Sequence, residues 1–289
     1  MISGIATAAV QVSWFAAQPC TSRERAIVPF SSRRTHHLGV QMRGRSLSIV
    51  VGMVAALVAW ASPWAPVAAA SDPVIIVAGT FSPAFANEPL AARVRADGHR
   101  VEIFELPTRG TQDINRSAQA LNTFADGVRA RTGASRVDLV GHSQGGLVAR
   151  SYVKDFGGAG EVDSLITLGT PNRGTYVANL VAFLGLGSCL DITACQQMAI
   201  GSGYLGALNA GDDTIGAVRY TTFRTAYDEL VRPVDNATLF DGAVNVRIQD
   251  QCWARIVGHV GLITDGTVYS GIRQALAGTR SIRLNCWAF

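Results

Sequence analysis

The sequence has no apolar run long enough to form a membrane-spanning helix. Its longest such stretch, Leu47 to Trp60, covers about 14 residues, whereas a spanning helix needs about 20. The basic segment Met42-Arg43-Gly44-Arg45 precedes this stretch and Ala68-Ala69-Ala70 follows it. Because this order is typical of a cleaved secretory signal, we expect residues 1–70 to be a leader, with the signal at Met42 to Ala70, and Ser71 to begin the mature chain. A membrane anchor is the alternative.

The expected mature chain also lacks a marked net charge. The whole sequence has 25 basic and 21 acidic residues, but six of the bases and one of the acids lie in the leader. The mature part therefore has 19 bases and 20 acids, a net charge of about −1. Nucleic-acid-binding domains present a strongly basic surface, so we expect no nucleic-acid partner. The sequence has no internal repeat, heptad pattern or low-complexity tract.

Histidine is scarce, and the mature chain has only His99, His142 and His259. Their positions do not form the close spacing that is typical of a metal site, so we expect no metal and no cofactor. Cysteine is also scarce, with four residues in the mature part. An even number in an exported chain suggests two disulfides. Three pairings are open, and the pairing of neighbours is Cys189 with Cys195 and Cys252 with Cys286.

Short apolar strands alternate with helical segments along the mature chain. Pro73 to Gly79 is a nearly continuous run of β-branched residues, typical of a strand buried on both faces of a parallel sheet. The pattern predicts an α/β fold with a doubly wound, mostly parallel sheet in one domain over residues 71–289. Strands are expected at 73–79, 100–106, 137–140, 162–168, 218–223 and 244–249, and helices at 89–96, 114–131, 144–156 and 267–277.

The alternation of strands and helices breaks at residues 174–215. This segment contains an apolar helical stretch, the loop from Cys189 to Cys195, and a second helical stretch rich in glycine and alanine. Two interpretations remain open. The segment either adds helices to the core or forms a cap or lid whose apolar underside lines an acyl-binding site.

The segment Val137 to Arg150 carries the strongest functional signal. A strand-type run meets Gly141-His142-Ser143-Gln144-Gly145, and apolar residues then return at helical spacing. This arrangement predicts a nucleophile elbow, with Ser143 on a sharp, strained turn that exposes its hydroxyl. Glycine is needed at 141 and 145 because a Cβ there would collide with the neighbouring backbone. We predict that Ser143 is a catalytic nucleophile.

A serine nucleophile needs a base, and His259 is the best candidate. It lies in a glycine-flanked loop after the last expected strand, within Gly258-His259-Val260-Gly261. His142 is adjacent to Ser143, but neighbouring side chains on an elbow diverge, so we interpret His142 as a packing residue. His99 has no special context and is interpreted as a surface residue.

The acid that orients the base is expected between the serine and the histidine in the chain. Asp228 follows the strand at 218–223, and functional groups in open α/β sheets gather at the carboxyl ends of strands. Asp228 is therefore the predicted acid, and Glu229 and Asp235 are the alternatives. The oxyanion needs hydrogen-bond donors, for which we predict the backbone N–H of Gln144 and of Thr80, with the Thr80 hydroxyl as a further donor.

Five segments together resemble a known family. The segments are Val77-Ala78-Gly79-Thr80, Gly141-His142-Ser143-Gln144-Gly145-Gly146, Thr167-Leu168-Gly169-Thr170-Pro171-Asn172-Arg173-Gly174, Tyr227-Asp228-Glu229-Leu230-Val231 and Gly258-His259-Val260-Gly261-Leu262. Over about residues 73 to 286 the chain resembles the class 2 secreted (EstA-type) esterase/lipases of the α/β-hydrolase superfamily. The oxyanion segments and the spacing of the last two cysteines are also similar to yeast lipase B.

The resemblance implies an α/β-hydrolase fold with a small helical cap or lid. It also implies a triad of Ser143, Asp228 and His259 and an oxyanion hole of Thr80 and Gln144. The chain departs from the pattern in its first loop, where Thr80-Phe81 stands in place of the His-Gly-type sequence of many lipases.

We therefore expect a secreted serine hydrolase of the lipase or esterase type that cleaves carboxylic esters through an acyl-enzyme. Its partner would be a lipid or a small ester, with transient contact to a lipid surface, and the protein would act as a monomer. Two other functions stay open. One is an acyltransferase with the same triad, and the other is a non-catalytic binding module, which predicts a decayed triad.

Overall fold

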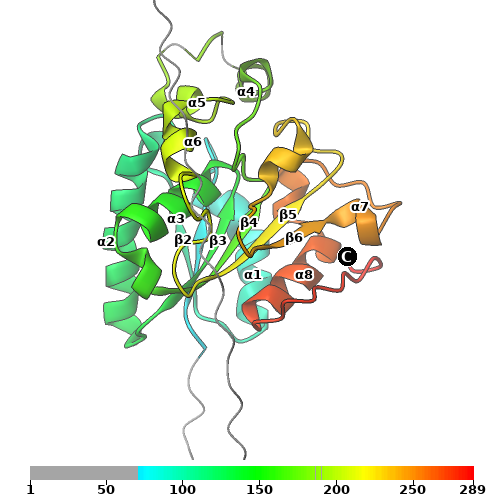
Figure 1. The fold of residues 1–289 in the computed structure, drawn as a ribbon. Coiled ribbons are helices and arrows are strands. Elements are labelled where there is room, and N and C mark those ends of the chain that lie inside the picture. Colours follow the sequence, from blue (N-terminus) through cyan, green and yellow to red (C-terminus); the bar gives the residue numbers. More distant parts are fainter. Residues whose placement is uncertain (1–70, 186, 190) are drawn as a thin grey trace, which may run out of the picture. The chain divides into compact units, whose positions relative to one another are not determined.

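Six parallel strands form one sheet in the computed structural model of the chain (Figure 1). The structure describes residues 71–289 except 186 and 190, so the expected leader lies outside the described residues. The spatial order of the strands is β2-β1-β3-β4-β5-β6. Their bounds are β1 Val74–Val77, β2 Val101–Phe104, β3 Val137–His142, β4 Val162–Leu168, β5 Arg219–Arg224 and β6 Val244–Arg247.

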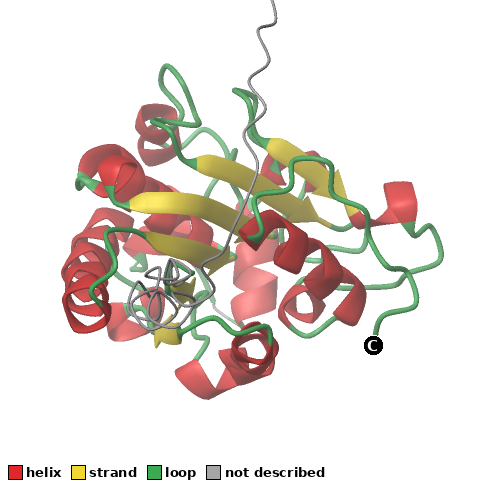
Figure 2. Ribbon diagram, turned by 90° about the horizontal axis from the view of Figure 1, so that it is seen from below, coloured by secondary structure: helices red, strands yellow, loops and turns green. Residues whose placement is uncertain are grey.

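The sheet is buried on both faces, as its apolar strands require. In β1, Ile75 and Val77 belong to one core cluster, while Val74 and Ile76 belong to another. Successive residues of a strand point to opposite faces, so the two clusters lie on the two sides of the sheet. The first cluster includes residues of α2 and α3, and the second includes residues of α1 and α8. Figure 2 shows the strands as one layer among the helices. This arrangement confirms the predicted doubly wound α/β fold.

The helices that cover the sheet are α1 Glu88–Ala96, α2 Ile114–Thr132, α3 Gln144–Asp155 and α8 Gly266–Leu276. Local sequence sets the ends of α2. The side chain of Asp113 accepts the N–H groups of Asn115 and Arg116, and Gly133 ends the helix with φ of 71°. An N-cap carboxylate and a left-handed glycine are favoured at these two positions. Among the described residues, no helix combines the length and the apolar character needed to cross a membrane.

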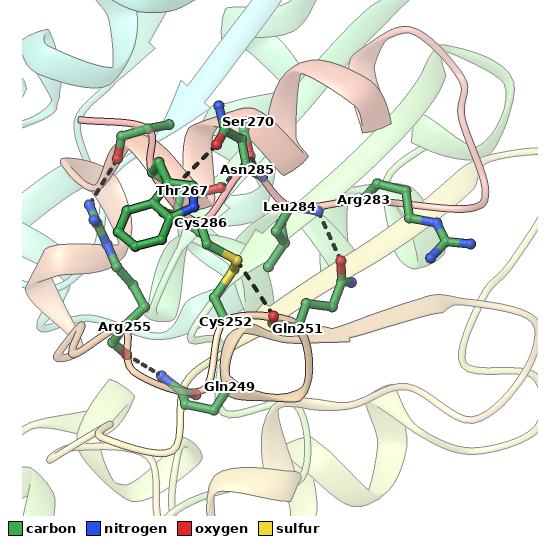
Figure 3. The surroundings of a disulfide bond; sticks show 12 residues. Gln249, Gln251, Cys252, Arg255, Thr267, Ser270, Arg283, Leu284, Asn285 and Cys286 are labelled. Atoms are coloured by element: carbon green, nitrogen blue, oxygen red, sulfur yellow. Dashed lines mark hydrogen bonds between the residues drawn. A yellow bond between two sulfur atoms is a disulfide. The ribbon is translucent and has the colours of Figure 1, made fainter.

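The last predicted strand is shorter than the sequence indicated. β6 ends at Arg247, and the short helix α7, Ile248–Gln251, occupies the end of the predicted segment 244–249. A disulfide then joins Cys252 to Cys286. As Figure 3 shows, Gln251 also binds the C-terminal segment, because its Oε1 accepts the N–H of Leu284 at 2.9 Å. These bonds hold the C-terminal segment against the end of α7.

Three short helices lie within residues 174–215, namely α4 Val177–Leu184, α5 Thr193–Gln197 and α6 Gly203–Leu208. A disulfide joins Cys189 to Cys195 in α5. Gln197 links α5 to α2, because its Oε1 accepts the N–H of Ile114 at 2.8 Å and its Nε2 donates to Asp113 at 2.7 Å. α6 packs on α3 and buries Leu205 and Leu208 in the core. The same core cluster includes Leu180 of α4 and Cys195 of α5, so all three helices are anchored to the core.

Asp138 is a buried carboxyl group in β3, at the end of the sheet opposite to Ser143. Its side chain is 4% exposed, and Oδ1 has no hydrogen-bond partner among the described residues. Burial, and then the charges of Asp163 and Asp72, raise the pKa of Asp138 to about 7, while Arg219 opposes the shift. The ionised form is therefore disfavoured in the folded protein.

We predict that Asp138→Asn stabilises the protein at pH 8. In the unfolded chain the carboxyl group ionises near pH 3.9. Between about pH 4 and about pH 7 the carboxyl group therefore carries a proton in the folded state and none in the unfolded state. Stability from this group therefore falls as pH rises through that window. Asparagine has no charge to bury, so Asp138→Asn should raise the free energy of unfolding by up to about 4 kcal/mol at pH 8. Urea unfolding at pH 8 and pH 5 measures the difference, which should shrink at the lower pH. The exposed Asp126→Asn is the control, and a gain that does not depend on pH would contradict the prediction.

Candidate active site

Ser143 lies on a strained turn between β3 and α3. β3 ends at His142 and α3 begins at Gln144, and Ser143 between them has φ of 54° and ψ of −127°. Its N–H donates to the carbonyl of Leu168 in β4 at 2.9 Å. A Cβ at Gly145 would lie 2.5 Å from the carbonyl oxygen of Ala78 and nearer still to that of Val77. The glycine is therefore required for α3 to begin this close to β1, and the serine has the geometry of a nucleophile elbow.

A cavity of about 540 Å³ opens above Ser143. Ser143 and His259 both line it, so the structure brings the predicted nucleophile and the predicted base to the same space. Apolar side chains make up most of the rest of the wall, and the segment at 174–215 contributes two of them, Leu180 and Met198. The remaining apolar side chains are Phe81, Pro83, Ala86, Leu230, Val260 and Ile263. A cavity of this size and lining fits a small apolar ligand.

Asp228 and His259 form a buried pair. His259 Nδ1 lies 3.0 and 2.9 Å from the two carboxylate oxygens of Asp228, and both side chains are almost fully buried. The carboxylate also accepts the N–H groups of Leu230 and Val231 at 2.9 and 2.7 Å. Gly169 leaves room for the pair, since a Cβ there would lie 3.1 Å from both Asp228 Oδ2 and His259 Nδ1. Asp228 is thus placed to hold the Nδ1 edge of the imidazole and to fix which ring nitrogen carries the proton.

The alternatives for the acid lie elsewhere. Asp235 pairs with Arg224 through Nε at 2.9 Å. The carboxylate of Glu229 accepts the backbone N–H of His259 at 2.8 Å, whereas that of Asp228 faces the imidazole. This contact was missed from the sequence, although the adjacent acids Asp228 and Glu229 were its one available signal.

His142 is also close to the candidate base. It is 5% exposed, its ring lies 4.9 Å from that of His259, and its Nε2 lies 3.1 Å from the His259 carbonyl oxygen. Burial, followed by repulsion from His259, lowers the pKa of His142 to about 3. The ring is therefore neutral at pH 7, and Nε2 carries the proton that it donates to the carbonyl. The sequence indicated packing for His142 and gave no sign of this bond.

The predicted oxyanion donors lie beside Ser143. Thr80 lines the cavity, and in the described part of the chain its N–H has no protein acceptor. Gln144 is the first residue of α3, so its N–H has no acceptor within the helix. The Thr80 hydroxyl donates to Gln144 Oε1 at 2.5 Å, so in this structure it links the loop after β1 to the start of α3 and is not directed at an oxyanion. The two backbone N–H groups are the better candidates for the donors.

Three carboxylates, of Asp212, Asp213 and Asp241, approach one another outside the lining of the cavity, with ligand atoms within 4.8 Å. Asp213 is the buried member, and its oxygens accept the N–H groups of Phe240 and Asp241. It also pairs with Arg173 at 2.8 Å. The protein itself satisfies the buried carboxylate, so the cluster holds two loops together and supplies no argument for a metal.

Comparison with known proteins agrees with this geometry. The model of the palmitoyl protein thioesterase family matches residues 73–230, more than half of the chain. A triacylglycerol lipase of Pseudarthrobacter phenanthrenivorans is 32% identical over 173 residues, which cover 55% of this chain and 53% of the lipase. A triacylglycerol lipase of Burkholderia plantarii is also 32% identical over 173 residues, covering 55% of this chain and 47% of that protein. The chain thus spans about half the length of the curated relatives it matches.

Two solved structures share the fold. Aspergillus fumigatus lipase B has a TM-score of 0.61 and 21% identity, over 72% of this chain and 52% of the lipase chain. A Bacillus licheniformis lipase in its mature form has a TM-score of 0.55 and 18% identity, over 68% of this chain and 88% of that chain. These similarities place the sheet and its helices in the α/β-hydrolase fold.

Proposed function

Because the chain belongs to the palmitoyl protein thioesterase family, we propose that it is a serine hydrolase of the lipase or esterase type that cleaves carboxylic esters. One observation carries the proposal. Ser143 lies on a strained elbow in the floor of an apolar cavity that His259 also lines, and Asp228 binds the ring of His259. A non-catalytic binding module would need none of these three side chains, whereas ester hydrolysis needs all of them. The proposal requires no cofactor and no metal.

In the proposed mechanism, His259 takes the hydroxyl proton of Ser143 as Oγ attacks the ester carbonyl carbon. The N–H groups of Thr80 and Gln144 stabilise the resulting oxyanion. The C–O bond to the alcohol then breaks, and His259 gives its proton to that oxygen, which leaves an acyl group on Ser143. Water, deprotonated by His259, attacks the acyl carbon, and the serine leaves with the proton. Asp228 stabilises the imidazolium that forms in both steps.

The cavity supports an apolar acyl group as the part of the substrate that is bound. Leu180 and Met198 are fully buried and cover one side of the cavity. We propose that residues 174–215 act in part as a cap, because α4 and the residue that follows α5 supply these two side chains. The names of the relatives suggest two substrate classes, the triacylglycerol esters of the lipases and the palmitoyl thioesters of the family.

A lipid surface is the proposed physical partner. The mouth of the cavity carries exposed apolar side chains, because Phe81 and Val260 line the cavity and are 37% and 52% exposed. Phe85 is 77% exposed and lies between Pro83 and Ala86, two further lining residues. Exposed aromatic groups around a cavity are typical of contact with lipid or another apolar surface. We also propose that the protein is secreted, which the two disulfides support.

Turnover of a series of acyl compounds tests the proposed function. The full chain is assayed with p-nitrophenyl esters from C2 to C18, with emulsified triacylglycerol and with a palmitoyl thioester. We expect hydrolysis of the esters and a fluorophosphonate adduct on the peptide that contains Ser143. Hydrolysis of soluble short-chain esters alone would make the protein an esterase and not a lipase. Faster transfer of the acyl group to an added alcohol than to water would support the acyltransferase. A serine that fails to react with the fluorophosphonate would contradict the proposal.

A further inference from the structure

His259 projects from a loop, not from a helix or a strand. α7 ends at Gln251, and the next regular element is the 3-10 turn Val260–Ile263. Loops are more mobile than the elements they connect. A misplacement of about 1 Å in a catalytic group can cost about 10²-fold in rate. If His259 is the base, as proposed above, this loop must be held in place.

The bond to Asp228 fixes only the imidazole. His259 Nδ1 faces the two carboxylate oxygens, but this contact leaves the main chain of His259 unrestrained. Two further side chains reach that main chain, one at its N–H and one at its carbonyl.

Glu229 holds the N–H of His259. Its Oε2 accepts this N–H at 2.8 Å, and a Cβ at Gly258 would lie 2.8 Å from the same oxygen. The glycine before the histidine therefore leaves room for the carboxylate. Glu229 is itself fixed at its backbone, because the adjacent Asp228 carboxylate accepts the N–H groups of the next two residues. The same turn thus contacts His259 at its ring and at its main chain.

His142 holds the carbonyl of His259. Its Nε2–H donates to this oxygen at 3.1 Å, and the N–H of Leu262 also donates to it, at 3.4 Å. His142 Nδ1 is buried and has no hydrogen-bond partner in the described structure, which agrees with a neutral ring protonated at Nε2. A neutral ring at this distance also avoids charge repulsion with His259 when that base becomes protonated.

We infer that Glu229 and His142 are positioning residues that hold the main chain of His259, so that the base is restrained at its N–H, its carbonyl and its ring. The inference rests on the proposed role of His259. It assigns Glu229 a function separate from that of its neighbour Asp228, and it gives the histidine of Gly141-His142-Ser143 a role in addition to packing.

Substitutions at Glu229 separate the hydrogen bond from the charge. Glu229→Ala removes the acceptor, so kcat on a p-nitrophenyl ester should fall about 10- to 100-fold with KM nearly unchanged. Glu229→Gln keeps an acceptor oxygen and should retain kcat within about threefold of the wild type. Asp235→Ala is the matched control, because Asp235 is an acid that pairs only with Arg224 in the described structure and lies outside the site. Equal kcat values for the wild type and Glu229→Ala, or equal losses in Ala and Gln, would overturn the inference.

Substitution of His142 tests the second contact. His142→Phe keeps a flat ring but removes the donor, and it should lower kcat about tenfold or more. His99→Phe is the control, because His99 does not line the cavity. Unfolding in urea must show that each variant is folded. A folded His142→Phe with wild-type kcat would overturn the role of His142.

Hydrogen exchange at the amide of His259 tests the restraint of its main chain by Glu229 and His142, here called the clamp, without any assay of activity. Glu229→Ala should raise the exchange rate of this amide by about tenfold or more, and Glu229→Gln should not. A wild-type protein without turnover but with this pattern would contradict the proposed function and leave the clamp standing. An active wild type whose His259 amide exchanges equally in all three proteins would overturn the clamp alone.

Discussion

Replacing Ser143 with alanine should lower kcat/KM for ester hydrolysis by about 10⁵-fold or more. The hydroxyl oxygen is the atom that forms the acyl bond, and no other nucleophile takes its place on the elbow between β3 and α3. Alanine keeps the Cβ and adopts the same backbone turn, with φ near 54°. We therefore expect the fold to survive, with a free energy of unfolding within about 1 kcal/mol of the wild type.

The matched control is Ser82→Ala, because Ser82 lines the same cavity and its hydroxyl accepts a hydrogen bond from Asn87 at 3.0 Å. Steady-state hydrolysis of a p-nitrophenyl ester and labelling with a fluorophosphonate measure the effect. Ser143→Ala should lose both reactions, and Ser82→Ala should keep both. Wild-type rates in a folded Ser143→Ala protein would rule out Ser143 as the nucleophile and with it the proposed acyl-enzyme.

The fold was predictable because local and long-range signals agree in it. All four residues of Val74–Val77 are apolar, so they are removed from water only if both faces of the strand are covered. The structure buries all four. The helix before β3 carries its own stop signal in Gly133. The elbow was predictable for the same reason, since Gly141 and Gly145 have a steric purpose that can be derived from the backbone alone.

The predicted strand at 244–249 shows where periodicity stops being informative. Ile248 is fully buried in the same core cluster as Val246, so the apolar pattern continues through the residue at which α7 begins. A short apolar run does not distinguish the end of a strand from the first turn of a helix. Only the path of the chain toward the Cys252–Cys286 disulfide reveals the difference.

The contacts of His259 could not be predicted for a different reason. Glu229 lies 30 residues before it and His142 lies 117 residues before it. Both contacts are made to backbone atoms of His259. The amino-acid type at position 259 therefore gives no sign of them. Sequence motifs therefore predicted three side chains for the proposed triad, while the two side chains that contact the backbone of His259 became visible only in the folded structure.

Asp228→Asn should lower kcat/KM about 10⁴-fold, which is the second largest effect we expect. Asparagine keeps an oxygen that can accept the N–H groups of Leu230 and Val231, so the turn should persist. Its amide group would then face His259 Nδ1 as a donor. Nδ1 would become an acceptor, and the proton would move to Nε2, the nitrogen that must receive the proton of Ser143. The base would thus be held in place in the wrong tautomer.

The assay of Asp228→Asn should include Asp235→Asn as the control, since both substitutions remove one carboxylate but only Asp228 contacts the imidazole. kcat/KM for a p-nitrophenyl ester, measured from pH 6 to pH 9, compares them. The loss of kcat/KM in Asp228→Asn should persist across this range. Raising the pH does not move the proton of a neutral imidazole from Nε2 to Nδ1, so it does not restore the active tautomer. A loss of less than tenfold would show that Asp228 is not the orienting acid. In that case the next group to test for that role would be the Glu229 carboxylate, which accepts the backbone N–H of His259.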